Sequence, residues 1–149
     1  MNNVSLQSTK SDEVILTALA HLNRGNVNSA IACFASEFHF KDHGLGLEFT
    51  DSERLAEFFH KIRELYPDSL VLTDQVFVSG KHVIVEWTLR ATLTEPFYGG
   101  LLRNVPVSVH GASIVQIDNG EISDWADYYD GRTSRRTALA AQFEEWVEL

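Results

Sequence analysis

The stretch GEISDWADYYD, residues 120–130, carries the pattern that decides how this chain folds. It leaves the tripeptide DNG at 118–120, which is typical of a tight hairpin turn, and then alternates as a β-strand does. Because alternate residues of a strand share one face, we expect Trp125, Asp127 and Tyr129 to point the same way. An ionised carboxylate buried without partners is costly. If this aromatic face is buried, Asp127 must therefore be paired, hydrogen-bonded or protonated.

Length and composition limit the kinds of protein that this chain can be. Its 149 residues suit one domain, predicted at 11–149 after a flexible arm at 1–10, and 44% of them are hydrophobic, enough for a core that folds unaided. The net charge of −9 argues against a nucleic-acid backbone or an anionic membrane surface as the partner. The chain has one cysteine, Cys33, and no apolar run of signal-peptide or membrane-span length. These features predict a cytoplasmic protein without a disulfide framework.

The first half of the chain predicts three helices. Helical periodicity begins after Ser11 and stops at residues 23–26, and a short second helix follows. Thr50 and Glu53 form a capping-box pattern that opens the third helix, which Pro67 ends. The side chains expected on the inner sides of these helices are Ile15, Leu19, Leu22, Ala30, Ile31, Phe34, Leu55, Phe58, Phe59 and Ile62.

The remainder of the chain reads mostly as β-structure. Strands are predicted at 37–42, where Gly44 and Gly46 break the pattern, and at 69–78, 82–94, 105–117 and 121–130. Residues 134–149 are again helical, and the loop at 95–104 is either a lid or a subunit contact. Helices followed by a largely antiparallel run of strands make an α+β domain. A curved sheet wrapped by helices in this way would enclose a pocket.

A second carboxylate lies on an otherwise apolar face. In the strand at 37–42, Asp42 follows Phe38 and Phe40 in period two, so all three are expected to point inward. Two interpretations stay open for Asp42 and for Asp127. Either the group serves a function in the pocket, or it lies at a strand end in contact with water or backbone amides.

The same alternation predicts the walls of the pocket. Apolar side chains from several elements are expected to face the two carboxylates, while Ser113 and Tyr129 supply hydroxyl groups that could donate hydrogen bonds to a substrate oxygen. The predicted substrate-binding residues are Trp125, Tyr129, Phe40, Trp87, Ser113, Phe59, Val109 and Trp146. Walls of this kind also occur in cores that bind no ligand.

With this order of elements, the chain resembles the nuclear-transport-factor-2-like (ketosteroid isomerase-like) superfamily, and within it the SnoaL-like polyketide cyclases and the limonene-epoxide hydrolases. The motif at 120–130 is the most specific similarity, and residues 22–26 and 32–35 resemble the family's helix-turn-helix opening. The resemblance covers residues 12–146. It implies a cone-shaped α+β barrel, in which a strongly bent mixed or antiparallel sheet is wrapped by three helices of the N-terminal half and a C-terminal helix.

The resemblance also implies catalytic roles for both carboxylates. Asp127 falls where limonene-epoxide hydrolases keep a catalytic aspartate, and Asp42, within FKDHG, falls where ketosteroid isomerases keep their general base. The arginine and second aspartate of the epoxide hydrolases fall on Trp87 and Leu89 in this chain. Both of these replacements lack the polar groups that orient an epoxide and a water molecule.

A further departure concerns the oxyanion hole. The tyrosine and the protonated aspartate of the isomerases fall near Ala18 and Ser113, which cannot stabilise an enolate comparably. We therefore expect a related, cofactor-independent enzyme that uses Asp127 and Asp42 in acid/base chemistry on a small apolar metabolite, of the isomerase, polyketide cyclase or epoxide-hydrolase type. The alternative is a non-catalytic dimeric module that binds a small hydrophobic ligand.

The positions of the histidines bear on whether the chain has a metal site and on whether it forms a dimer. His39 and His43 flank Asp42, but alternation places His39 on the opposite face, so no metal site is predicted. His110 and Ile114 are expected on the outer face of the sheet, where an exposed isoleucine needs covering. Together with the family's frequent dimerisation through that face, this predicts a homodimer.

Overall fold

The computed structural model describes residues 10–93 and 105–130 of the chain. Two of the predicted segments, the loop at 95–104 and the helix at 134–149 with Trp146, lie outside the described residues, as does the predicted arm except for Lys10. None of the helices described is long and apolar enough to cross a membrane.

Three helices form where the periodicity predicts them. They are α1 (Lys10–Asn23), α2 (Val27–Ile31) and α3 (Ser52–Leu65). The expected Thr50–Glu53 capping box is wrong by one residue, because Asp51 is the N-cap and its Oδ1 accepts a hydrogen bond from Arg54 N at 3.0 Å. A carboxylate at the N-cap satisfies one free amide of the first turn and also meets the positive end of the helix dipole.

The strands form one six-stranded sheet with the order β2-β1-β6-β5-β4-β3. Every neighbouring pair is antiparallel except β1 and β6, which run parallel. The family resemblance implied a mixed or antiparallel sheet, and the structure shows that the sheet is mixed. The strands are β1 (Phe34–Asp42), β2 (Leu47–Phe49), β3 (Leu70–Ser79), β4 (His82–Leu93), β5 (Val105–Asp118) and β6 (Glu121–Tyr129).

The first strand begins earlier than predicted, and a short strand that was not predicted follows it. Phe34, expected on the second helix, begins β1 and is buried. Gly44 and Gly46 break the strand after Asp42, as predicted, and form a tight turn into β2. The Gly46 amide donates to the Asp42 carbonyl at 2.8 Å, and Gly46 has a φ of +73°. Glycine adopts this left-handed conformation without the penalty that a side chain incurs.

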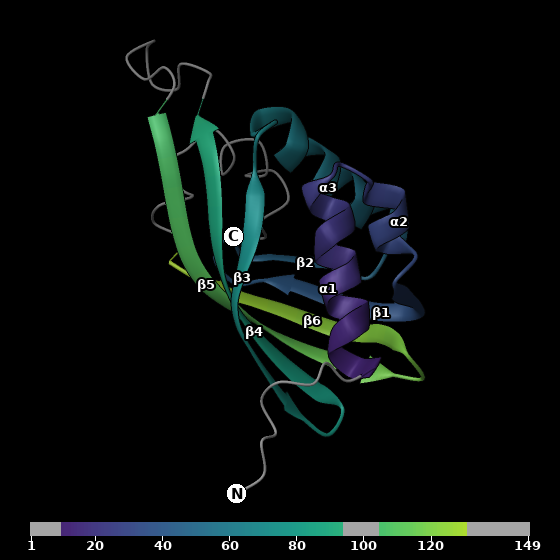
Figure 1. Ribbon diagram of the computed structural model, residues 1–149. Coiled ribbons are helices and arrows are strands. Elements are labelled where there is room, and N and C mark those ends of the chain that lie inside the picture. The colour runs from purple at the N-terminus through teal and green to yellow at the C-terminus, as the bar shows by residue number, and fades with distance from the viewer. Residues whose placement is uncertain (1–9, 94–104, 131–149) are drawn as a thin grey trace, which may run out of the picture.

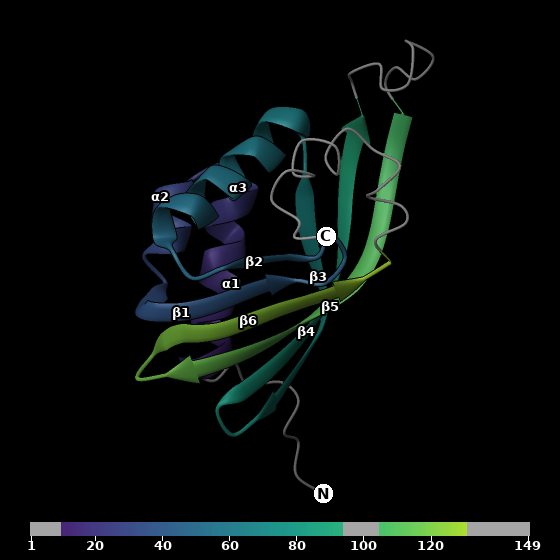
Figure 2. The same cartoon turned by 180° about the vertical axis from the view of Figure 1, so that it is seen from behind.

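The sheet bends strongly, and the three helices of the described residues lie over its concave side (Figures 1 and 2). Its register shifts between Thr73 and Gln75 and between Gln116 and Ile117, and such irregularities increase local twist and curvature. Side chains of the concave face and of the helices form one buried core. The bend and the helical cover thus create the setting in which a cavity lies between the two layers.

Gly111 allows a large aromatic side chain to lie flat on the concave face. Gly111 and Trp87 are cross-strand partners. A Cβ atom at Gly111 would lie 2.5 Å from Trp87 Cη2 and 2.8 Å from the backbone oxygen of Tyr128. Gly44 lies in the same way against the ring of Tyr129. Both aromatic side chains are therefore positioned by the absence of a neighbouring side chain.

The substitution Gly111→Ala should lower the free energy of unfolding by about 1–3 kcal/mol, because the added methyl group overpacks the core against Trp87 and the backbone. Urea denaturation monitored by tryptophan fluorescence measures this change. Ser108→Ala, at an exposed position of the same strand, is the matched control and should change stability by no more than about 0.5 kcal/mol. Equal stability of Gly111→Ala and the unsubstituted protein would contradict the packing role.

Candidate functional site

A cavity of about 150 Å³ lies between the helices and the concave face of the sheet. Both predicted catalytic residues, Asp42 and Asp127, line it. So do seven of the eight predicted substrate-binding residues, namely Trp125, Tyr129, Phe40, Trp87, Ser113, Phe59 and Val109. The eighth, Trp146, lies outside the described part of the chain. Most of the remaining lining residues are aliphatic or aromatic.

Strand pairing brings the polar groups of the site together. In the parallel pairing of β1 with β6, Asp42 lies beside Asp127, and in the antiparallel pairing of β5 with β6, Ser113 lies beside Asp127 from the other side. Residues that face one another across neighbouring strands share a face of the sheet. Three polar side chains from distant parts of the sequence therefore form one row on the concave face.

Asp127 is held through one of its two oxygens. Its Oδ1 accepts hydrogen bonds from Ser113 Oγ at 2.5 Å and from Trp125 Nε1 at 2.7 Å. Trp87 Nε1 donates to the same Ser113 hydroxyl at 2.8 Å, so two indole rings and a hydroxyl group fix the orientation of the carboxylate. In the part of the chain that the structure describes, no hydrogen bond reaches Oδ2.

The environment of Asp127 raises its pKa to about 7. Desolvation in the cavity wall is the largest cause, since burial disfavours the charged form. The charge of Asp42 acts in the same direction, while the hydrogen bonds from Ser113 and Trp125 favour the anion and lower the pKa. Desolvation and carboxylate repulsion exceed these two bonds, so Asp127 can both release and accept a proton near neutral pH.

Asp42 is more deeply buried, with 5% of its surface exposed. Its Oδ1 accepts hydrogen bonds from Tyr129 Oη at 2.7 Å and from the Leu45 amide at 2.8 Å. Desolvation nevertheless raises the pKa of Asp42, although these bonds and the nearby His43 oppose the rise. Because Asp42 and Asp127 also repel each other, the two carboxyl groups titrate as a pair.

The hydroxyl groups of Ser113 and Tyr129 have a different use from the one predicted. Both were expected as donors to a substrate oxygen, but in the structure Ser113 donates to Asp127 and Tyr129 donates to Asp42. A hydroxyl group has a single proton to donate. These two residues therefore position the carboxylates, and neither proton is free for a substrate in this arrangement.

Sequence reasoning did not identify Arg63 as a lining residue. Its Nη1 donates to the carbonyl oxygens of Asn23 at 3.1 Å and Ser69 at 3.2 Å, and all three residues line the cavity. A signal was present, because Arg63 follows the inward-facing Phe59 by four positions and therefore lies on the same helix face. Other lining residues that were not predicted as part of the site are Ala18, Leu19, Leu22, Val27, Phe34, Leu45, Phe58, Ile62, Val71 and Leu89.

The histidines beside Asp42 point away from the site. His39 Nε2 lies 3.2 Å from Glu48 Oε2, and the ring of His43 stacks on Tyr128, which is exposed. Among residues 10–93 and 105–130, no group of three or more His, Cys, Asp or Glu side chains is arranged to hold a metal ion.

The raised pKa of Asp127 should make stability depend on pH. The folded protein keeps this proton up to about pH 7, whereas the unfolded chain releases it near 3.8, so raising the pH between these values favours unfolding. Relative to Asp127→Asn, which keeps the shape and cannot ionise, the unsubstituted protein should lose at most about 4 kcal/mol of unfolding free energy between pH 4 and 8. Urea denaturation across this range measures the difference.

Asp118→Asn is the matched control for this experiment. Hydrogen bonds from Ser123, Lys81 and Gln116 lower the pKa of Asp118 to about 2, so the stability that its charge provides is present above the unfolded value and is lost only at lower pH. The difference in unfolding free energy between Asp118→Asn and the unsubstituted protein should thus be constant between pH 5 and 8. If the difference in unfolding free energy is constant for Asp127→Asn as well, the pKa of Asp127 is not raised in the folded protein.

The chain matches the family model of the SnoaL-like polyketide cyclases over residues 13–137. A comparison with curated proteins found no match. Among solved structures, a protein from Jannaschia sp. CCS1, provisionally described as a SnoaL-like polyketide cyclase, is 19% identical with a TM-score of 0.74, and the match covers 95% of this chain and 99% of that one.

Two further solved structures are similar. TerC, co-crystallised with polyporic acid, is 13% identical with a TM-score of 0.72 over 87% of this chain and 98% of its own. A protein with a ketosteroid isomerase-like fold from Catenulispora acidiphila, in complex with trimethylamine, is 21% identical with a TM-score of 0.68 over 78% of this chain and 85% of its own. At these identities the structural likeness establishes a shared fold and no shared substrate.

Proposed function

The chain belongs to the SnoaL-like polyketide cyclase family, and we propose that it is a small-molecule enzyme in which Asp127 transfers protons to and from an apolar metabolite. The observation that carries this proposal is a carboxyl group with a pKa of about 7 in the wall of an apolar cavity. General acid/base catalysis works best when the pKa of the catalytic group lies near the working pH.

The hydrogen bonds of Asp127 assign a role to each of its oxygens. Ser113 and Trp125 both donate to Oδ1, so they stabilise the anion and hold its plane. Oδ2 then takes the proton from a carbon beside a substrate carbonyl. The C–H bond electrons become the enolate, and the proton returns from Asp127 to the same carbon or to another one. Return to a different carbon is an isomerisation. In a cyclisation the enolate carbon instead attacks a second carbonyl carbon, the π electrons of that carbonyl move to its oxygen, and this oxygen takes the proton from Asp127.

Asp42 sets the proton affinity of Asp127. Its negative charge is the second cause of the raised pKa of Asp127, and its own hydrogen bond from Tyr129 holds its carboxylate in the cavity wall. With one proton shared between the two groups, one carboxyl is available as a base while the other is neutral. Asp42 is therefore the partner that keeps Asp127 poised near neutral pH.

Solvent exchange tests the proposal without knowledge of the natural substrate. A small cyclic ketone such as 2-indanone, incubated in deuterium oxide, should exchange its α-protons faster with the protein, and the catalysed rate should rise as pH increases through about 7 because the ionised carboxylate is the base. Asp127→Asn should lower the rate by about 100-fold or more. Asp42→Asn should retain partial activity with its pH profile moved downward, because the repelling charge is gone. Proton NMR follows the exchange.

Asp124→Asn, on the same strand as Asp127 but absent from the cavity wall, is the matched control and should leave the rate unchanged. The alternative function is a module that binds a small hydrophobic ligand without turnover. It predicts that the ketone binds with no exchange above the buffer rate, equally in the unsubstituted protein and in Asp127→Asn. That result would contradict the enzymatic proposal.

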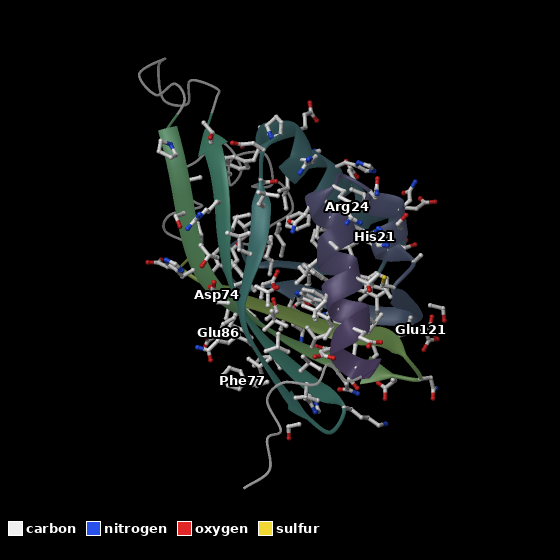
Figure 3. All side chains as sticks on the ribbon, viewed as in Figure 1. His21, Arg24, Asp74, Phe77, Glu86 and Glu121 are labelled. Carbon is white, nitrogen blue, oxygen red and sulfur yellow. The ribbon has the colours of Figure 1, made fainter. Side chains whose placement is uncertain are left out.

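We further propose that the outer face of the sheet binds a second copy of the chain. Strand register places Phe77, Ile84 and Ile114 in one row, with 49%, 40% and 41% of their surfaces exposed. Figure 3 shows Phe77 and Glu86 on the side of the sheet away from the helices. Glu86 and Arg90 follow on the same face of β4, and a two-fold axis would allow each copy to pair its acidic residue with the basic residue of the other.

Ile114→Glu should convert such a dimer to a monomer, because it places a charge at one end of the apolar row, next to Ile84. Sedimentation velocity at 10–100 µM protein measures the association state. Ala32→Glu, an equal change of charge at an exposed position on the helical side, should leave the dimer intact. A monomeric unsubstituted protein, or a dimeric Ile114→Glu variant, would contradict the proposed interface.

A further inference from the structure

Arg63 brings a positive charge to a cavity whose other charged side chains are acidic. Among the described residues that line the cavity, Asp42, Asp127 and Arg63 are the side chains of charged type. The two carboxyl groups belong to the sheet, whereas Arg63 belongs to the last turn of α3, which lies on the helical side. Acidic and basic groups therefore enter the cavity from different layers of the molecule.

The position of the Arg63 guanidinium is fixed by backbone groups. Its Nη1 donates to the carbonyl oxygens of Asn23 and Ser69. Asn23 is itself held to β3 by two hydrogen bonds with Val71, one in each direction, of 3.0 and 2.8 Å. The guanidinium is thus placed where the end of α1, the end of α3 and the start of β3 meet.

The charge of Arg63 has no carboxylate partner in the described part of the chain. Its hydrogen-bond acceptors there are neutral carbonyl groups, and none of the salt bridges among these residues involves it. The charge of Arg63 also acts on Asp68, but it is the weakest of the causes that determine the lowered pKa of Asp68. Arginine offers five N–H donors in a planar fork that matches a carboxylate, and the two bonds to carbonyl groups use only Nη1.

The size of the cavity determines where a ligand would meet this charge. A volume of about 150 Å³ is that of a pocket which holds a single benzene ring. A larger molecule must extend toward the lining residues that are partly exposed. Arg63 is one of these, together with Leu22, Asn23, Phe59, Ile62 and Val71 on the helical side and the start of β3, while Leu89, Val109, Asp127 and Tyr129 are partly exposed on the sheet side.

From this geometry we propose that the substrate is an amphipathic carboxylic acid, whose carboxylate binds Arg63 while its apolar part with the reacting carbon lies against Asp127. The proposal rests on the proposed function for the identity of the reacting end and adds the class of substrate. Arg63 is then a specificity-determining residue. Repulsion from Asp42 and Asp127 excludes the reverse orientation, in which the substrate carboxylate would lie among the acidic groups.

Binding of a matched ligand series tests the role of Arg63. The probes are 3-phenylpropanoate, 4-phenylbutanoate and the corresponding neutral amides, which have the same ring and chain. Isothermal titration calorimetry at pH 7.5 should show at least about tenfold tighter binding of the best carboxylate than of its amide, as expected for a hydrogen-bonded ion pair. Arg63→Gln should abolish this preference and leave the affinity for the amide unchanged.

Arg24→Gln is the matched control, because Arg24 is an exposed arginine next to Asn23 that does not line the cavity. It should keep the preference for carboxylates. If Arg63→Gln fails to fold, the Arg63 Nε–H signal in the NMR spectrum of the unsubstituted protein, assigned by its loss in Arg63→Lys, decides instead. This signal should shift on addition of the carboxylate and stay in place on addition of the amide.

The outcomes separate this inference from the proposed catalysis. Asp127→Asn should retain the preference for carboxylates even though it exchanges no protons, so a failure of catalysis leaves the role of Arg63 measurable. The inference is overturned if the unsubstituted protein binds no member of the series, if it binds the amides as tightly as the carboxylates, or if the preference persists in Arg63→Gln.

Discussion

The parallel contact between β1 and β6 places Asp42 beside Asp127 on the concave face of the sheet, and the rest of the site depends on it. Two carboxyl groups on neighbouring strands repel each other when both are ionised, and here the apolar surroundings weaken the solvation that would otherwise reduce this repulsion. The hydrogen bonds that these two carboxyl groups accept can be understood as a response to that constraint. Trp125 and Ser113 bind one oxygen of Asp127, and Tyr129 and a backbone amide bind Asp42.

The balance of these effects differs between the two groups. Asp127 combines desolvation with repulsion from its neighbour, and its two side-chain donors only partly offset them, so its pKa reaches about 7. Asp42 is the more buried of the two but receives backbone donors from the adjoining turn as well as the Tyr129 hydroxyl. A shared proton between unequal partners is a natural basis for acid/base chemistry, because a small change in the surroundings moves it.

Packing and chemistry are linked through the aromatic side chains. Trp87 and Tyr129 lie against Gly111 and Gly44, and from those positions their polar ends reach Ser113 and Asp42. The same rings provide apolar surface for the cavity. Rigid aromatic groups with one polar end suit this double use, because they exclude water and still satisfy a buried acceptor.

The sequence by itself determined which residues share a face, because period two in strands and period 3.6 in helices follow from local geometry. Asp42, Asp127 and part of the apolar wall could be predicted in this way, and the family resemblance supplied the strongly bent sheet. Tertiary structure decided what local patterns do not contain. It paired β1 with β6, turned the hydroxyl groups of Ser113 and Tyr129 toward the carboxylates, and brought Arg63 to Asn23 and Ser69. Apart from the contact of Arg63 with Ser69, these contacts join residues far apart in the chain, so their geometry depends on strand register and helix packing rather than on local periodicity.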